Sequence, residues 1–261
     1  MKRFAVIGDP IAHTLSPLIH NYNFKLNGDN YSYEAIHILP KALLNIRDIA
    51  QKHALDGFNV TLPHKTAIIA HLDDISSAAR DVGAVNTVDI VDGKFTGYNT
   101  DVSGYQNALQ ETFELQPQLN VLILGGGGAA KAVHRVHHYL GHHVTIAVRN
   151  LEKIRDFSSL PYKAVRLNEV DLKGYDIIIN ATPIGLAGED VFKVLELSAD
   201  ISNNTIGIDL IYNTHTPFLN YFTHKMDGLG MLVHQAMDAY TIWTGGSGQP
   251  DKVKDMLAEK L

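Results

Sequence analysis

The 261-residue sequence contains no cysteine, so disulfide bonds, thiolate zinc sites and cysteine nucleophiles are excluded. An excess of positive charge is also missing: 22 lysines and arginines stand against 28 aspartates and glutamates, a formal net charge of -6. A mildly acidic chain has no overall field that draws it to nucleic acid or to an anionic membrane, and we expect neither as a partner. No apolar run approaches the roughly 20 residues that span a bilayer. The run Phe4–Ile7 ends at Gly8-Asp9-Pro10, well short of a signal-peptide core, so we expect a soluble cytoplasmic protein.

The composition is that of an ordinary globular protein, with 45% hydrophobic and 19% charged residues. At roughly 150 residues per domain, the length predicts one large or two modest domains. Short apolar runs alternate along the chain with longer stretches of helical period, which is typical of an α/β fold.

The first 100 residues predict a mixed α/β unit. Its expected strands are 4–7, 31–38 and 57–61, followed by a hairpin of 85–91 and 94–98 around Asp92-Gly93, a dipeptide that favours hairpin turns. Its expected helices are 17–25, with Ser16 as N-cap and Pro17 at the first position, and 41–53.

A second unit begins after the region of Pro117. Strand 120–124, a glycine run, helix 131–140 and strand 144–148 form a βαβ unit, and its strands have almost no polar face, as expected for parallel strands covered on both sides. Buried strands are also predicted at 175–180 and 205–211, and two final helices at 232–243 and 251–261.

The glycine run indicates a nucleotide site. Gly125, Gly127 and Ala130 fit the G-x-G-x-x-G/A fingerprint between a strand and a helix. The first glycine makes the turn, the second lets a pyrophosphate approach the backbone, and the small third residue packs the helix against the strand. The alternative is a tight glycine turn without a ligand.

The end of the second strand bears on which dinucleotide binds. Arg149 lies 149 − 127 = 22 residues after Gly127, where an NAD site would carry an aspartate or glutamate for the ribose. A guanidinium suits a 2′-phosphate by charge and by bidentate geometry, so NADP is favoured. The alternative is that Arg149 is a solvated surface residue.

Three polar clusters in the first unit are expected where strands end. They are 13–17, 59–65 and 83–87, the last followed by Asn99-Thr100-Asp101. Hydroxyls, amides, one lysine and one aspartate suit the binding of a small polyhydroxylated acid. Each residue also has a structural alternative: Ser16 as an N-cap, Asn86 as a turn residue, Asp101 as a helix cap and Lys65 as a solvated side chain.

Further motifs follow in the second half of the chain. In chain order the full set is Thr14-Leu15-Ser16-Pro17, N-V-T-x-P-x-K at 59–65, G-A-V-N-T at 83–87, N-T-D at 99–101, the glycine turn, N-A-T-P-x-G at 180–185, Asp209-Leu210-Ile211-Tyr212-Asn213, and G-x-G-M-L-V-x-Q-A at 228–236 with Trp243-Thr244-Gly245 after it. In this order, over nearly the whole chain, the sequence resembles the shikimate dehydrogenase family.

The resemblance implies NADP-linked interconversion of 3-dehydroshikimate and shikimate, a step in the synthesis of aromatic amino acids. It implies a substrate-binding α/β domain of residues 1–101 with 232–261, a Rossmann-type NADP-binding domain of residues 102–231, and a cleft between them that holds the active site. Lys65 and Asp101 would be the catalytic pair, in which the ammonium donates a proton to the forming alkoxide and the carboxylate orients it. The substrate carboxylate would be held by Thr14 and Ser16, and the implied contacts to its hydroxyls are Asn59, Thr61, Asn86, Asp101 and Gln235, with Tyr212 nearby.

For the cofactor, the resemblance implies contacts from Gly125, Gly126, Gly127, Gly128, Ala129, Ala130, Arg149, Lys153, Thr182 and Gly228. The sequence departs from the family pattern at Val148-Arg149-Asn150, where N-R-T is common, so one amide that would help to hold the adenosine phosphate is missing. Thr14 replaces the usual serine, Val102 replaces a common glycine, and the stretch after Tyr212 lacks the usual proline.

The 14 histidines raise the question of a metal site. His134 and His138 have i, i+4 spacing on the predicted helix, but there is no H-E-x-x-H and no nearby acidic ligand. We therefore expect no metal, and interpret His134, His137, His138, His142 and His143 as a solvated, partly charged helix face.

Three alternative functions remain open. The first is a quinate/shikimate dehydrogenase that uses NAD. The second is a dinucleotide-binding sensor on the same scaffold without activity, which the presence of both Lys65 and Asp101 disfavours. A methylene-tetrahydrofolate dehydrogenase is disfavoured because the polar clusters suit a small acid rather than a pterin. In every case the expected partner is a small molecule and the expected state a monomer or homodimer.

Overall fold

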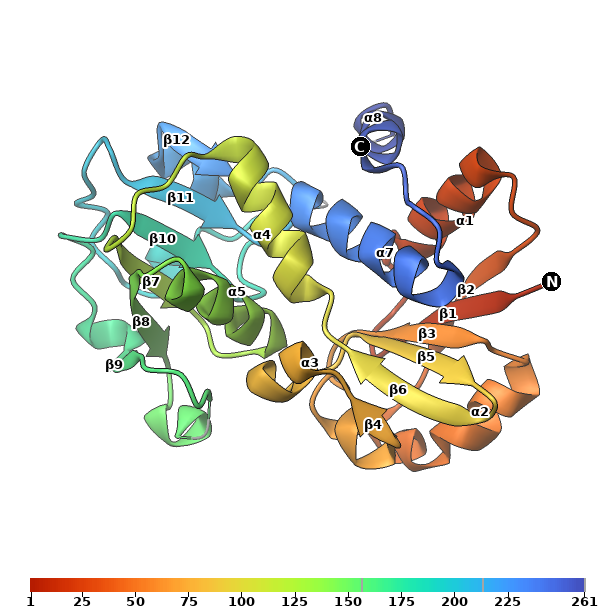
Figure 1. Ribbon diagram of the computed structural model, residues 1–261. Helices are drawn as coiled ribbons and strands as arrows, with labels where there is room; N and C mark the ends of the chain where they lie inside the picture. Colours follow the sequence, from red (N-terminus) through yellow and green to blue (C-terminus); the bar gives the residue numbers. More distant parts are fainter. Residues whose placement is uncertain (156, 213, 261) are drawn as a thin grey trace. The chain divides into compact units, whose positions relative to one another are not determined.

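The computed structural model describes residues 1–155, 157–212 and 214–260. Asn213, in the motif after Tyr212, and Leu261, the end of the last predicted helix, lie outside the described residues. The chain forms two compact units, residues 1–104 with 233–260 and residues 105–232, and each is built on its own six-stranded sheet (Figure 1). The predicted α/β class with two domains is confirmed. In the described parts of the chain, no helix has the length and apolarity that a membrane crossing requires.

The sheet of the first unit has the strand order β2-β1-β3-β5-β6-β4. Its strands are β1 (Arg3–Gly8), β2 (Ser32–His37), β3 (Gly57–Val60), β4 (Asp74–Ile75), β5 (Thr87–Val91) and β6 (Lys94–Tyr98). The first three are parallel, whereas β5 is antiparallel to both β3 and β6. The predicted hairpin is confirmed: Asp92 and Gly93 both have positive φ, 51° and 76°, which is the conformation of a type I′ turn.

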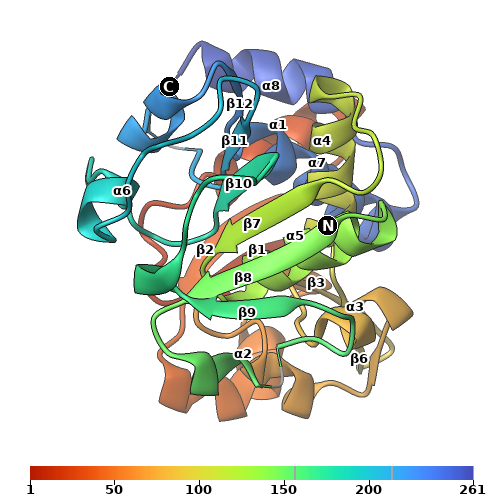
Figure 2. The ribbon, with the colours of Figure 1, turned by 90° about the vertical axis from the view of Figure 1, so that its left-hand side faces the viewer.

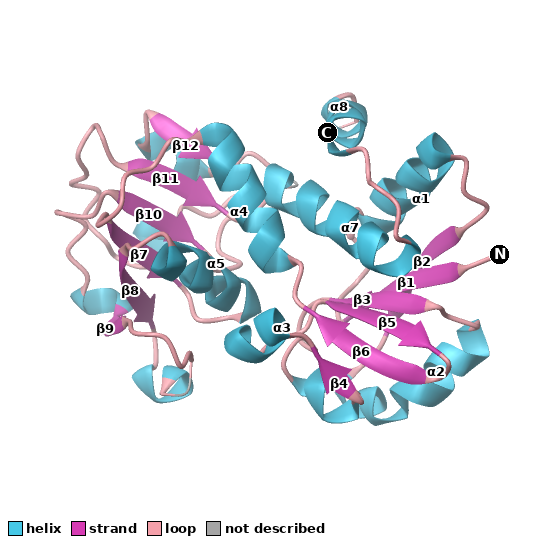
Figure 3. Cartoon of the chain, viewed as in Figure 1, coloured by secondary structure: helices cyan, strands magenta, loops and turns pink. Residues whose placement is uncertain are grey.

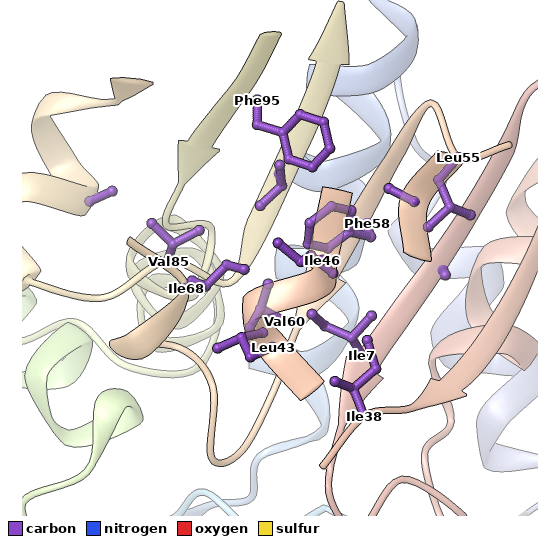
Figure 4. Close-up of a cluster of buried hydrophobic side chains, with 14 residues drawn as sticks. Ile7, Ile38, Leu43, Ile46, Leu55, Phe58, Val60, Ile68, Val85 and Phe95 are labelled. Atoms are coloured by element: carbon purple, nitrogen blue, oxygen red, sulfur yellow. The ribbon is translucent and has the colours of Figure 1, made fainter. Parts of the chain in front are cut away.

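Helices cover both faces of this sheet. They are α1 (Ser16–Asn27), α2 (Ile46–His53), α3 (Ser77–Val82), the start of α4 (Asp101–Thr112), most of α7 (Leu229–Thr244) and α8 (Pro250–Ala258), with 3-10 helices at Pro40–Asn45 and Ala67–His71. Side chains alternate along β1: Ala5 and Ile7 join a core cluster with Ile46 of α2 (Figure 4), whereas Phe4 and Val6 join a second cluster against α1 and α7.

Two local predictions in this unit are wrong. Ser16 is not the N-cap of α1: Leu15 already has helical φ and ψ, Ser16 is the first helical residue, and its N–H donates to Thr14 Oγ1 at 3.3 Å. The helix predicted at 41–53 is two helices, because Asn45 leaves the helical region (φ -98°, ψ 18°) and separates the 3-10 helix from α2.

The sheet of the second unit is parallel throughout, with the strand order β12-β11-β10-β7-β8-β9 (Figures 2 and 3). Its strands are β7 (Asn120–Leu124), β8 (His143–Val148), β9 (Lys163–Arg166), β10 (Ile177–Asn180), β11 (Ile206–Asp209) and β12 (His224–Met226). Helix α5 (Gly128–Tyr139) connects β7 to β8, as predicted. The edge strands β9 and β12 and the short helix α6 (Val191–Val194) were not predicted.

His134 and His137 of α5 and His142 in the turn after it are buried, so the predicted solvated face is wrong for these three residues. Ala130, Val133, His134 and His137 recur at i, i+3, i+4 and i+7, which is the pattern of a core-facing helix stripe. Side chains at these positions face the sheet whatever their polarity.

Hydrogen bonds fix the tautomers of two of these histidines. His142 Nε2 lies 3.1 Å from the carbonyl oxygen of Gln116, which only accepts, so this nitrogen carries the proton. His142 Nδ1 then accepts from His137 Nδ1 at 2.8 Å, and His137 Nε2 accepts from the Tyr105 hydroxyl at 2.7 Å. With both rings neutral, each ring nitrogen of this chain has a hydrogen-bond partner of the opposite kind.

This burial predicts acid sensitivity. Burial, reinforced by His142, lowers the pKa of His137 from 6.5 to about 3, so the folded protein excludes a proton that the unfolded chain binds below pH 6.5. The stabilisation is complete above pH 6.5 and is lost as the pH falls toward 3, about 2 kcal/mol between pH 6.5 and 5. In urea unfolding at about pH 7 and about pH 5, His137→Gln should lose about 2 kcal/mol less than the unmodified protein between the two conditions.

The exposed His224 supplies the control. His224→Gln should keep the pH dependence of the unmodified protein. If the two variants lose equal stability on acidification, His137 is not the excluded proton site.

Candidate active site

Lys65 and Asp101 form a buried ion pair in the first unit. Lys65 Nζ lies 2.6 Å from Asp101 Oδ2, and the side chains are only 19% and 6% exposed. Lys65 is in the loop after β3 and Asp101 is the first residue of α4, where the positive end of the helix dipole favours a carboxylate. Asp101 does not cap the helix, since Asn99 Oδ1 accepts the N–H of Val102. The structure therefore brings together the two residues that the resemblance implies as the catalytic pair.

Asn86 holds the second oxygen of the aspartate. Its Oδ1 accepts the backbone N–H of Thr100 at 2.7 Å, and a backbone N–H only donates, so the orientation of the amide is fixed. Asn86 Nδ2 consequently faces Asp101 Oδ1 at 2.9 Å, with Gln235 Oε1 at 3.4 Å. Asp101 is thus bonded on both oxygens, which reduces the cost of burying its charge.

Asn59 lies in the same hydrogen-bonded network. Its Nδ2 donates to the carbonyl oxygen of Asn86 at 3.1 Å and to Thr87 Oγ1 at 2.9 Å. Thr87 Oγ1 in turn donates to Asn86 Oδ1 at 3.1 Å. Thr87 was not among the predicted site residues, although it closes the G-A-V-N-T motif, and it links Asn59 to Asn86.

The hydroxyl residues of the predicted site follow strands of the same sheet. Thr14 and Ser16 come after β1, with Thr14 Oγ1 donating to Ser16 Oγ at 3.2 Å. Thr61 comes after β3, and its N–H donates to the carbonyl oxygen of Ile7 in β1. Ligands of open α/β sheets bind at the carboxyl ends of the parallel strands, where these residues lie.

The first unit thus holds an ammonium, a carboxylate and two amides in one hydrogen-bonded network, and the hydroxyls of the predicted site follow strands of the same sheet. Its ammonium can donate a proton while the paired carboxylate keeps it in place, and the remaining groups can bind the polar substituents of a small acid.

In the second unit, the glycine turn has the shape that a phosphate needs. Gly125 has φ 108°, and a Cβ there would lie 2.9 Å from the carbonyl oxygen of Ala181. Gly127 precedes the first turn of α5, and a Cβ on it would meet nothing within 4 Å. Ala130 is fully buried. The backbone at Gly127 is therefore open to a ligand at the N-terminus of α5, an arrangement suited to a pyrophosphate.

Two cations follow the next strand. Arg149 and Lys153 are both exposed, Arg149 directly after β8 and Lys153 within the 3-10 helix Leu151–Ile154. Asn150 caps this helix, its Oδ1 accepting the N–H of Glu152 at 3.0 Å. Val148 is buried beside Gly126 and offers no polar group. These residues fit a dinucleotide with a 2′-phosphate through charge.

The remaining predicted residues lie beyond β10 and β11. Thr182 Oγ1 donates to Asn180 Oδ1 at 2.7 Å, so this hydroxyl shapes the loop after β10. Gly228 must be glycine, because a Cβ there would lie 2.2 Å from the carbonyl oxygen of Leu210. Tyr212 follows β11, and partial burial raises the pKa of its hydroxyl.

Asp209 joins these loops and was missed as a site residue, although it begins a quoted motif. Its Oδ1 accepts Asn180 Nδ2 at 3.0 Å and its Oδ2 accepts Thr216 Oγ1 at 2.6 Å. Burial raises the pKa of this carboxyl, and the donors oppose the increase. The loops after β10 and β11 are therefore tied to one buried group.

Among the described residues, no group of three or more histidine, aspartate or glutamate side chains could hold a metal ion. The polar side chains of the site form hydrogen bonds with one another.

Comparison with known proteins shows which family the chain is similar to. Residues 6–88 match the family model described as the shikimate dehydrogenase substrate binding domain, and residues 228–247 match the model of the shikimate 5'-dehydrogenase C-terminal domain. The NADP(+) shikimate dehydrogenase of Staphylococcus epidermidis is 39% identical over 268 residues, which is 99% of this chain and 98% of that protein.

Two solved structures bear on the ligands. A shikimate 5-dehydrogenase from Thermus thermophilus, in complex with NADP(H) and shikimate, has a TM-score of 0.87 and 33% identity, with full coverage of this chain and of that chain (100% and 100%). One from Listeria monocytogenes, in complex with shikimate and NAD, has a TM-score of 0.84 and 32% identity, covering 98% of this chain and 96% of that chain.

The geometry of the glycine turn predicts that alanine changes the free energy of unfolding by different amounts at Gly125 and at Gly127. Gly125→Ala should lower the free energy of unfolding by about 2 kcal/mol or more, because of its positive φ and the close carbonyl of Ala181. Gly127→Ala should stay within about 1 kcal/mol of the unmodified protein, because its φ is -82° and the space around it is open. Urea unfolding measures both, and equal losses would contradict the described turn.

Proposed function

The chain belongs to the shikimate dehydrogenase family, and from that membership we propose that it catalyses the reversible NADPH-dependent reduction of 3-dehydroshikimate to shikimate in aromatic amino acid biosynthesis. The observation that carries the proposal is the buried contact between Lys65 and Asp101. An oxidoreductase that makes an alcohol from a ketone needs a proton donor of this kind beside the carbonyl oxygen. We assign the activity to the cytoplasm, because NADPH and 3-dehydroshikimate are both small, charged, water-soluble molecules.

The substrate roles follow the chemistry of each side chain. The hydroxyls of Thr14 and Ser16 bind the carboxylate. The groups that contact the substrate hydroxyls are Asn59, Thr61, Asn86, Asp101 and Gln235, with Tyr212 nearby. Both amide hydrogens of Asn59 already donate within the protein, so Asn59 offers a substrate hydroxyl the remaining lone pair of Oδ1.

The catalytic pair handles the proton. NADPH, when bound, supplies the hydride that the carbonyl carbon takes up. Lys65 donates a proton from Nζ to the carbonyl oxygen as negative charge develops there, and takes it back in the oxidation direction. Asp101 keeps that nitrogen in place at 2.6 Å and is itself held by Asn86.

The cofactor roles follow the shape of the second unit. NADP is the cofactor that these residues fit. Residues 125–130 would hold the pyrophosphate, Arg149 and Lys153 would pair with the 2′-phosphate, and Thr182 and Gly228 would complete the cofactor site.

An absorbance assay at the nicotinamide band tests the proposal. With shikimate or quinate as substrate and NADP or NAD as cofactor, kcat/KM should be highest for shikimate with NADP, because Arg149 rather than a carboxylate follows Gly127 at the expected distance. A preference for quinate and NAD would favour the quinate/shikimate alternative. Tight NADPH binding without turnover would favour the sensor and contradict the proposed activity.

Replacement of the lysine tests the mechanism. Lys65→Ala should lower kcat by about 10²–10⁴ with a smaller change in KM, because proton donation acts in the transition state. Steady-state rates in both directions measure this. Lys52→Ala, at an exposed lysine of α2, is the control and should keep the unmodified rates. An unchanged kcat in Lys65→Ala would remove Lys65 from the mechanism.

A further inference from the structure

We propose that Tyr33 of β2 is a positioning residue of the substrate site, which acts by fixing the Asn59 amide with its hydroxyl. The inference rests on the proposed function, because Asn59 takes its role from it. Tyr33 is only 4% exposed, and its hydroxyl lies 2.6 Å from Asn59 Oδ1.

The direction of this hydrogen bond follows from the backbone. Asn59 Nδ2 faces the carbonyl oxygen of Asn86 at 3.1 Å, and a carbonyl only accepts. The nitrogen of the amide must therefore lie on that side and its oxygen must face Tyr33. The Tyr33 hydroxyl is the donor. Burial raises the pKa of Tyr33 well above its ordinary value, so the hydroxyl keeps this proton at neutral pH.

The amide that Tyr33 fixes begins a continuous chain to the catalytic pair. Asn59 Nδ2 donates to Thr87 Oγ1, and Thr87 Oγ1 donates to Asn86 Oδ1. Asn86 Nδ2 donates to Asp101 Oδ1, while Asp101 Oδ2 accepts from Lys65. The Asn59 side chain makes three hydrogen bonds, to Tyr33, Asn86 and Thr87, so a rotation of its amide would disturb all three at once.

Tyr33 itself is held by α1 from two directions. Asn21 Oδ1 accepts the Tyr33 N–H and Asn21 Nδ2 donates to the Tyr33 carbonyl oxygen, both at 2.9 Å. The His20 ring stacks on the Tyr33 ring with centroids 4.2 Å apart and an interplanar angle of 8°. His20 is fully buried, and it lies beside Asn59 as well as against the Tyr33 ring. Helix α1 therefore packs against both partners of the hydrogen bond between Tyr33 and Asn59.

Tyr33→Phe tests this role by removing one oxygen atom from a ring that stays stacked. We expect the KM for shikimate to rise about tenfold, because Asn59 Oδ1 loses its donor and the amide is free to turn. The kcat and the KM for NADP should stay within about twofold, since Lys65 and Asp101 keep their direct contact. Thr87→Val, which removes the next hydroxyl of the chain, is a second variant and should also raise the KM for shikimate.

Tyr240→Phe is the matched control. Tyr240 lies in the same core cluster, and its hydroxyl donates to Asp29 Oδ2 at 2.8 Å, away from the chain that leads to Asp101. This variant should leave the KM for shikimate unchanged. The fluorescence of Trp243, the single tryptophan, reports the packing of this cluster in each variant, because its ring centroid lies 6.2 Å from that of Tyr33.

A double-mutant cycle distinguishes positioning from general loosening. In an Asn59→Ala background, Tyr33→Phe should have no further effect on the KM for shikimate, because the residue through which it acts is gone. An unchanged KM in both Tyr33→Phe and Thr87→Val, an equal rise in Tyr240→Phe, or a full effect in the Asn59→Ala background would overturn the inference. Failure of the unmodified protein to oxidise shikimate would instead overturn the proposed function.

Discussion

The buried contact between Lys65 and Asp101 constrains the rest of the first unit. Two charges can stay out of water only when they are close together and their remaining bonding capacity is used. Asp101 meets this condition through Asn86 and the N-terminus of α4, whereas Lys65 pairs with Asp101 and keeps 19% of its side chain exposed to water. The sheet order places β3 beside β5, so the loop that carries Lys65 lies near Asn86, the residue before β5. Strand β6 follows β5 in the sheet, and Asp101 after β6 is bonded to Asn86. The topology therefore brings together two residues that are 36 positions apart in the sequence.

The second unit also buries a carboxyl group, that of Asp209, but without a cation beside it. Asp209 ends β11 beside Asn180 at the end of β10, and it is surrounded by neutral donors rather than by a cation. Neutral donors leave the carboxylate as the centre of a small structural network, which holds the loops after both strands. In both units the polar residues gather where parallel strands end, because only there does the backbone leave the apolar interior of the sheet.

Much of this could be predicted from the sequence, and the misses have physical causes. Apolar runs predicted the central strands, and the glycine turn and Asp92-Gly93 have the shapes that their residues require. The edge strands β9 and β12 were missed because they lie at sheet margins and carry polar and charged side chains. The buried histidines were missed because polarity was given more weight than the helical period of their positions.

Some residues of the site were predicted and others were not. The pair of Lys65 and Asp101 was predicted from the motif resemblance, because no local sequence pattern places a lysine in a loop beside the start of a helix. Thr87, Asp209 and Tyr33 were not predicted, because their importance lies in hydrogen bonds to residues distant in sequence. The domain boundaries and the cleft stay predictions. The structure adds the direction of each hydrogen bond in the network. The backbone N–H of Thr100 orients the Asn86 amide, and the backbone carbonyl of Asn86 orients the Asn59 amide, before any ligand binds. These amides are therefore already oriented when the substrate binds, and little of the binding free energy is lost in ordering their side chains.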